Sequence, residues 1–265
     1  MIAASTWVSG LFSSKLAENR SSSATRWTPT VVSVMAFEAD VKLDRDNVAM
    51  ANERNVCAGP FGSVYDFYIE RESLSRLVGR LVWGIDVRPM YRSMGVIGEL
   101  ADGATILDVP CGGGVALRGL RPGQRARYIA VDLSEAMLDR VRHRAADRAL
   151  QHCETVQADM TALPVEDATA DLCLCYSGLH IVNDPEAVIA EIARCLKPGG
   201  DLLGATFLLG GSRRQRFLIK RGKRRGEFGV SGTSEDLRKW LTRTGFTDVS
   251  IDRDDGFAVF RASRS

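Results

Sequence analysis

The sequence has no long apolar run, because none of its hydrophobic stretches approaches the roughly 18 residues that a membrane-spanning helix needs. It also has no Cys-x-x-Cys pair among its six cysteines, so small buried packing residues are favoured over metal ligands. In a chain of 265 residues this usage predicts reduced thiols and a cytoplasmic location instead of a disulfide framework.

The first part of the chain lacks sustained periodicity. Residues 1–55 are rich in Ser, Thr, Asn and Ala, and no basic stretch precedes their apolar residues, so a secretory signal is poorly supported. We expect this segment to be flexible, or to be translated from an upstream start codon. Lid helices are expected over 56–103, and 104–265 would form the main domain.

Helical spacing of apolar residues begins near Pro60 and continues to Val82. A second helix is predicted on Val87, Met90, Tyr91 and Met94, ending at Asp102-Gly103. These helices precede the main domain, so they can only pack beside or over its site. Tyr65 and Asp66 are therefore lid candidates, with a plain core role as the alternative.

Strand and helix patterns then alternate, as in a parallel, doubly wound sheet. Strands are predicted over 104–109, 127–131, 154–158, 171–176 and 201–208, and helices over 113–121, 134–150, 184–196 and 233–243. Residues 246–251 and 256–261 alternate on either side of a turn, which predicts a terminal hairpin.

The first of these strands ends in a carboxylate, Asp108, and a glycine cluster at 112–114 follows it. Strand, acid, glycine turn and helix in this order build nucleotide-type sites. The glycines let the main chain approach a ligand closely. Asp108 places a negative charge where a ligand's ammonium group could be held. A nucleoside joined to an amino acid fits this pattern, and S-adenosylmethionine (SAM) is such a ligand.

Two more acids, Asp132 and Asp159, stand where the next two strands end. In an open α/β sheet the ligand lies across these ends. Asp132 follows Gly114 by 18 residues, close to the spacing expected for a carboxylate that binds ribose hydroxyls. Asp159 and Met160 suit an adenine rim, with an acceptor for the exocyclic amine and a soft side chain against the ring.

Two dinucleotide interpretations are weaker. A nicotinamide fingerprint needs a third glycine where this chain has Leu117, and no Tyr-x-x-x-Lys pair lies near the fourth strand. A phosphate-binding loop needs a lysine that does not follow Gly114. A glycine turn that only joins a strand to a helix is the remaining alternative.

At these motifs the chain resembles the class I SAM-dependent methyltransferases, over roughly residues 60–262. D-V-P-C-G-G-G is similar to their first motif, V-D-L-S-E-A-M-L to the ribose motif, A-D-M-T-A-L-P to the adenine motif and L-K-P-G-G to the turn before strand five. The likeness is closest to the small-molecule branch typified by ubiquinone/menaquinone-biosynthesis enzymes. One departure is Pro110, which replaces the first glycine of the loop.

The resemblance implies a Rossmann-like, seven-stranded, mostly parallel sheet with an antiparallel last strand and N-terminal lid helices. It also implies SAM as the cofactor and assigns residues to each part of it. Asp108, Cys111 and the backbone from Gly112 to Gly114 would hold the methionine part, Asp132 the ribose with Leu133 and Met137 nearby, Asp159 and Met160 the adenine, and Tyr176 and Ser177 the cleft wall.

The implied reaction is methyl transfer to a small-molecule acceptor, lipid-like or aromatic. Because the sulfonium is already activated, alignment can supply roughly 7–11 kcal/mol, and no base is obligatory. His180, just beyond the fourth strand, is the candidate base and, with Tyr65, a candidate substrate contact. A packing role for His180 is the alternative.

Charge argues against a nucleic-acid substrate. The net charge is +2, but residues 213–225 carry +8, which leaves −6 for the rest of the chain. The sequence Cys-Tyr-Ser-Gly at 175–178 also differs from the [DNS]-P-P-[YFW] motif of amino-group nucleic-acid methyltransferases. The segment 213–225 could cover the acceptor, contact an anionic membrane peripherally, meet an acidic acceptor or RNA, or be a solvated loop. A non-catalytic SAM-binding partner or regulator is the rival function, ahead of an RNA methyltransferase and an NAD-dependent oxidoreductase.

Overall fold

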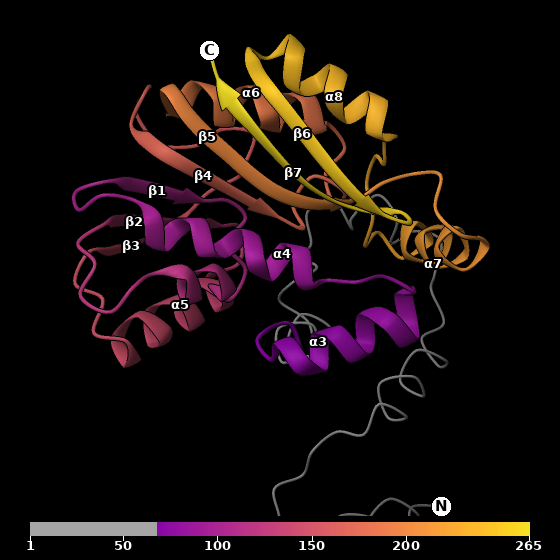
Figure 1. Ribbon diagram of the computed structural model, residues 1–265, viewed down its shortest axis with the longest axis horizontal. Helices are drawn as coiled ribbons and strands as arrows, with labels where there is room; N and C mark the ends of the chain where they lie inside the picture. Colours follow the sequence, from indigo (N-terminus) through magenta and orange to yellow (C-terminus); the bar gives the residue numbers. More distant parts are fainter. Residues whose placement is uncertain (1–67) are drawn as a thin grey trace, which may run out of the picture. The chain divides into compact units, whose positions relative to one another are not determined.

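The computed structural model describes residues 68–265, which belong to one compact unit. They form a seven-stranded sheet with the order β3-β2-β1-β4-β5-β7-β6 (Figure 1). The strands are β1 (Thr105–Asp108), β2 (Arg127–Asp132), β3 (Cys153–Gln157), β4 (Ala170–Tyr176), β5 (Leu196–Phe207), β6 (Phe246–Asp254) and β7 (Phe257–Arg264). The first five strands are parallel, and β7 is antiparallel to both β5 and β6. The predicted fold class is confirmed.

Helices cover both faces of the sheet, because neighbouring strand residues point to opposite sides. Ile106 packs in a cluster with Met90 and Leu138, whereas Leu107 packs in a second cluster with Ile189 and Leu237. Figure 1 shows α4 and α5 on one side and α6 and α8 on the other. The helices are α3 (Glu72–Val78), α4 (Arg88–Ser93), α5 (Glu135–Asp147), α6 (Pro185–Cys195), α7 (Arg213–Arg224) and α8 (Ser234–Arg243), with a π-helix η3 (Gly79–Trp83) and 3-10 turns η4 (Met94–Glu99) and η5 (Val115–Gly119).

The prediction of a helix over 113–121 is wrong, because only the 3-10 turn η5 forms there. Gly119 packs so closely on η4 that a Cβ atom would lie 2.1 Å from the carbonyl oxygen of Met94. The chain then leaves the turn in an extended conformation at Leu120. Tertiary packing therefore stops this helix after one turn.

The turn predicted before strand five is corrected, because residues 197–200 are part of β5, and the ladder with β4 carries an irregularity there. Ser134 occupies the N-cap position of α5, but its hydroxyl makes no capping hydrogen bond. At the start of α8, Thr233 and Asp236 form a reciprocal capping box.

The basic segment is a helix and not a loop. Ser212 caps α7 by accepting a hydrogen bond from the backbone N–H of Gln215, and the chain buries Gln215, Ile219 and Gly222 along one side. These positions are separated by four and three residues, which places them on one helical face. Packing of that narrow face holds a helix whose other side chains are mostly basic.

Several sequence predictions lie outside the described residues, namely those for 1–55, Tyr65 and Asp66. The boundaries proposed at 56 and 104 stay predictions. Within 68–265, no helix is both long enough and apolar enough to cross a membrane.

Candidate active site

A cavity of about 510 Å³ opens at the carboxyl ends of the parallel strands. This is where ligands bind in open α/β sheets, and the volume is within the range of small-molecule sites. Its wall includes nine of the predicted residues, Asp108, Cys111, Gly112, Asp132, Leu133, Asp159, Met160, Tyr176 and Ser177. Gly114, Met137 and His180 are not part of that wall.

The glycine loop reaches the cavity through Gly112 and Gly113. Gly112 and Gly114 both have positive φ, of 49° and 82°, which glycine adopts without steric cost. A Cβ atom on Gly114 would lie 3.1 Å from the Val141 side chain, so this glycine serves close packing against α5. Arg144 of α5 donates a hydrogen bond to the Gly113 carbonyl oxygen, which fixes the loop from behind.

Asp108 forms the floor of the cavity and is only 2% exposed. Its Oδ2 accepts a hydrogen bond from the Tyr128 hydroxyl at 2.6 Å. Burial raises the pKa of Asp108 to about 7; the Tyr128 hydrogen bond opposes the rise, and nearby Asp132 adds to it. None of these causes is a positive charge. A cationic ligand would therefore be favoured beside this carboxylate.

Asp132 shapes the loop as well as lining the cavity. Its Oδ2 accepts from the backbone N–H of Gly112 at 2.9 Å, and its Oδ1 accepts from that of Ser134 at 2.9 Å. The carboxylate thus ties the end of β2 to the glycine loop and to the first turn of α5. A substitution at Asp132 would disturb both the loop and any ligand on it.

The adenine side of the predicted site is open. Asp159 accepts hydrogen bonds from the backbone N–H and the hydroxyl of Thr161 at 2.8 and 2.7 Å, so its Oδ1 is fixed by its own turn. Leu133, which also lines the cavity, is half exposed. Met160 lines the cavity and packs against the second core cluster.

The end of β4 supplies cavity wall beside α4. The Tyr176 hydroxyl lies 2.8 Å from Ser93 Oγ, which joins α4 to the cavity, and burial raises the pKa of Tyr176. Ser177 has a φ of 61°, a left-handed conformation that is uncommon for a residue with a Cβ atom. Such backbone conformations cluster at functional sites.

His180, the candidate base, is buried in an aromatic cluster. Its ring centroid lies 5.0 Å from that of Phe228 and 5.1 Å from that of Phe207. Nδ1 accepts from the backbone N–H of Phe207 at 3.3 Å, and burial lowers the pKa of His180 to about 3. This geometry suits a neutral packing residue, and the role of His180 as a base stays a prediction. Met137 is likewise buried.

Sequence reasoning missed the wall that faces the acids. Ile69, Met90, Ile181, Val182 and Glu227 line it, from the lid, the loop before α6 and the loop after α7. Ile69 and Met90 carried a usable signal, as parts of the helical spacing of apolar residues before the sheet. Ile181, Val182 and Glu227 lie outside the helices, in segments whose sequence gives no indication that they meet.

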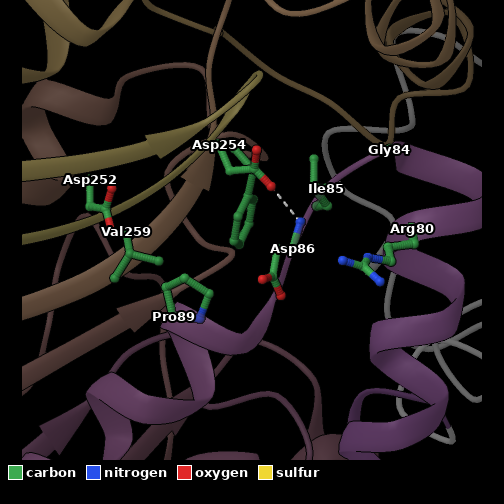
Figure 2. A pocket seen from close by; sticks show the side chains of 9 residues that line it. Arg80, Gly84, Ile85, Asp86, Pro89, Asp252, Asp254 and Val259 are labelled. Atoms are coloured by element: carbon green, nitrogen blue, oxygen red, sulfur yellow. Dashed lines mark hydrogen bonds between the residues drawn. The ribbon is translucent and has the colours of Figure 1, made fainter.

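A second cavity, of about 350 Å³, lies between the segment after η3 and the β6–β7 hairpin (Figure 2). Asp86, Asp252 and Asp254 line it together with Arg80. Here Asp254 accepts from the backbone N–H of Asp86 at 2.5 Å, and Asp86 binds Arg88 through contacts of 2.5 to 2.9 Å. Within the described part of the chain, no group of His, Cys, Asp and Glu is arranged to hold a metal ion.

Comparison with known proteins gives a family match over residues 107–204, to the family described as "Methyltransferase domain". A malonyl-[acyl-carrier protein] O-methyltransferase of Hahella chejuensis is 37% identical over 39% of this chain and 36% of its own length. A ubiquinone/menaquinone biosynthesis C-methyltransferase of Idiomarina loihiensis is 29% identical over 64% of this chain and 66% of its own length.

A solved structure, the phosphoethanolamine N-methyltransferase 2 of Haemonchus contortus with S-adenosyl-L-methionine, has a TM-score of 0.58 at 16% identity, covering 67% of this chain and 52% of that one. This likeness concerns the fold. The chain spans only about a third to two thirds of the length of the two relatives described above. The family match falls on β1, the glycine loop and the strands that bring the three acids together, so residues 107–204 are similar to a methyltransferase domain.

Proposed function

We propose that this protein transfers the methyl group of SAM to a small-molecule acceptor in the cavity at the carboxyl ends of the strands. The observation that carries the proposal is Asp108, a buried carboxylate at the cavity floor whose pKa is raised to about 7 by burial. A buried acid without a cationic partner costs free energy, and a cationic ligand removes that cost.

The residues present fit SAM. Asp108 would hold the positively charged methionine part, and the Gly112 and Gly113 backbone allows a close approach. Asp132 would bind ribose hydroxyls and Asp159 with Met160 would face adenine, since all three residues line this cavity. The sequence predicted these three roles, and their geometry on one cavity wall supports them.

SAM, when bound, supplies a methyl group already activated on a sulfonium. The task of the protein is then alignment and the exclusion of water. Ile69, Met90 and Tyr176 close the side of the cavity nearest the lid, and the Ser93 contact to Tyr176 fixes that side. A general base is needed only for an acceptor of high pKa.

We further propose that the acceptor is small and largely apolar, because Ile69, Met90, Ile181 and Val182 line the same cavity as the acids. Glu227 adds one carboxylate to that wall and lies 3.8 Å from Arg225. The names of the relatives, which refer to quinone biosynthesis and to an acyl carrier, support a small or carrier-linked acceptor. A cytoplasmic location is part of this proposal and rests on the five described cysteines, all free thiols.

The proposal is tested by calorimetry with SAM and with NAD, followed by transfer of a labelled methyl group from SAM into a cell extract. We expect binding of SAM but not NAD, and a labelled small molecule that is absent with Asp108→Ala. Binding of SAM without any labelled product would favour the rival, a non-catalytic SAM-binding partner or regulator. Binding of NAD alone would contradict the site assignment.

A further inference from the structure

The outward face of α7 is strongly basic and carries one aromatic ring. Arg213, Arg214, Phe217, Lys220 and Arg224 are all exposed. Relative to Phe217 the four basic residues stand at positions −4, −3, +3 and +7, so they share one side of the helix with it. The Phe217 side chain is 66% exposed, and no acidic residue occurs between 213 and 225. We call these five residues the basic face.

The basic face is held rigidly to the body of the protein by the opposite side of α7. The Gln215 side-chain amide donates a hydrogen bond to the carbonyl oxygen of Trp83 at 3.3 Å. Gly222 touches the ring of Phe228, because a Cβ atom there would lie 2.6 Å from that ring. Ile219 is buried between these two contacts along the helix. The basic face therefore has a fixed orientation.

The chain leads directly from α7 to the candidate active site. Gly226 and Glu227, just after the helix, line the main cavity. Gly229 then donates to the carbonyl oxygen of His180 at 2.9 Å, and Val230 to that of Val182 at 2.8 Å. Figure 1 shows α7 beyond the end of the sheet to which the arrows of β4 and β5 point, which is the cavity end. A surface bound by α7 would thus lie close to the cavity.

Exposed aliphatic side chains lie on the loops that adjoin α7. Ile181, Leu209 and Val230 are large apolar residues left exposed, and Ile181 also lines the cavity. Val230 and Leu209 belong to neighbouring loops, since Val230 pairs with Val182 and Leu209 donates to the Gly232 carbonyl oxygen. Basic residues alone would suit any polyanion. Basic residues combined with exposed Phe and aliphatic side chains match a bilayer interface, where anionic headgroups lie above acyl chains.

We propose that the basic face docks this protein onto a lipid bilayer with anionic headgroups, with Phe217 entering the interface. The docking surface itself follows from charge and exposure alone. Its purpose rests on the proposed function: an apolar acceptor in the bilayer would reach a cavity whose mouth carries Ile181 and Val182. The partner is thus the membrane surface, and the acceptor class narrows to lipid-like molecules.

The test uses the full chain and sedimentation with vesicles of phosphatidylcholine alone or with about one third phosphatidylserine. Each basic residue near an anionic surface contributes about fivefold to binding. Replacing Arg213, Arg214, Lys220 and Arg224 by Gln should therefore weaken binding to the anionic vesicles at least about a hundredfold. Phe217→Ser should weaken it by about tenfold, and this loss should persist at high salt, because ring burial is not screened.

A matched variant replaces four basic residues on other surfaces, Arg121, Arg125, Lys239 and Arg243, by Gln and so loses the same charge. It should bind vesicles almost as the wild type does. Equal losses in the two quadruple variants, or binding to neutral vesicles alone, would overturn the proposal. Tighter binding to single-stranded RNA than to vesicles, lost with the same α7 residues, would assign the basic face to nucleic acid instead. Calorimetry with SAM on each variant separates these outcomes from a failure of the proposed function.

Discussion

The two cavities of this protein both contain aspartates, but their electrostatics are opposite. In the main cavity Asp108 is buried, bonded to the Tyr128 hydroxyl, and its pKa is raised to about 7. In the second cavity Arg88 binds Asp86 and lowers the pKa of that carboxyl to about 2 (Figure 2). The Asp86 carboxylate has its counter-charge within the chain, in Arg88. No cation is among the groups that shift the pKa of Asp108, and a cationic ligand would supply that charge.

The difference shows why acidic residues in a pocket do not by themselves indicate a binding site. The Asp86 carboxylate already has its counter-charge in the Arg88 guanidinium, and it also accepts a hydrogen bond from the Arg88 backbone N–H. Asp108 is kept at the floor of a cavity at a free energy cost that packing elsewhere offsets. A pKa that burial shifts this far, on a side chain that lines a cavity, is typical of functional sites.

The largest expected effect is on stability as a function of pH. The folded-state pKa of Asp108 is raised from 3.8 to about 7, so its contribution is fully present below pH 4 and is lost as pH rises to 7. This corresponds to about 4 kcal/mol as an upper limit. Asp108→Asn should therefore be more stable than the wild type at pH 8 in urea unfolding and show a flatter pH dependence.

Asp86→Asn should change the pH dependence of stability at acidic pH, in the opposite direction to Asp108→Asn. Its lowered pKa gives stability above pH 4 that is lost as pH falls toward 2. The comparison between the cavities breaks down if the two variants shift the pH profile in the same direction.

The next largest effect is on SAM affinity. Asp108→Ala should weaken binding by at least about a hundredfold, because a desolvated charge contact is lost. Asp86→Ala is the matched control and should bind SAM as the wild type does, since Asp86 lies in the other cavity. Calorimetry at pH 8 measures both, and circular dichroism confirms that each variant is folded. Equal affinity in the two variants would contradict the assignment.

Removing the Tyr128 hydroxyl should increase the difference in pKa between Asp108 and Asp86. Its hydrogen bond is the one contact that lowers the pKa of Asp108, so Tyr128→Phe should raise that pKa further. At pH 7 a smaller fraction of Asp108 would then be ionised, and SAM affinity should fall by roughly tenfold. The loss should shrink at pH 9. A loss independent of pH would mean that the hydroxyl acts by some other route.

The smallest effect is expected from making the second cavity resemble the first. Arg88→Gln removes the partner of Asp86, and the pKa of Asp86 should return toward 3.8, as measured by NMR titration. Because this ion pair is exposed to solvent, the free energy of unfolding should change only slightly. If Arg88→Gln changes the affinity for SAM, the two cavities are coupled.

The sequence predicted the part of the fold that short signals determine. β1, β2 and β4 are apolar runs that end at an acid or before a glycine turn, and β3 is a more polar strand that ends two residues before Asp159. These four strands were placed to within about a residue or two. The acids at those ends were found for the same reason. Asp108, Asp132 and Asp159 all line the cavity because parallel strands bring their carboxyl ends to one edge.

Long-range packing decides what the sequence did not predict. The helix predicted after the glycine loop stops at Gly119, which packs against Met94. No local sequence pattern predicts that contact. The helix α7 is held by three buried residues among seven basic ones, so the charge obscured its period. Ile181, Val182 and Glu227 reach the cavity from loops that only the folded chain brings together.

The most direct test of the central claim is the number of protons released when SAM binds, measured by calorimetry at pH 6 in buffers of different ionisation enthalpy. With a pKa of about 7, Asp108 is mostly protonated at pH 6 and must ionise to hold a cation. We predict release of close to one proton per SAM bound by the wild type and by Asp86→Asn, and almost none by Asp108→Asn. SAM binding with no proton release by the wild type would contradict the account.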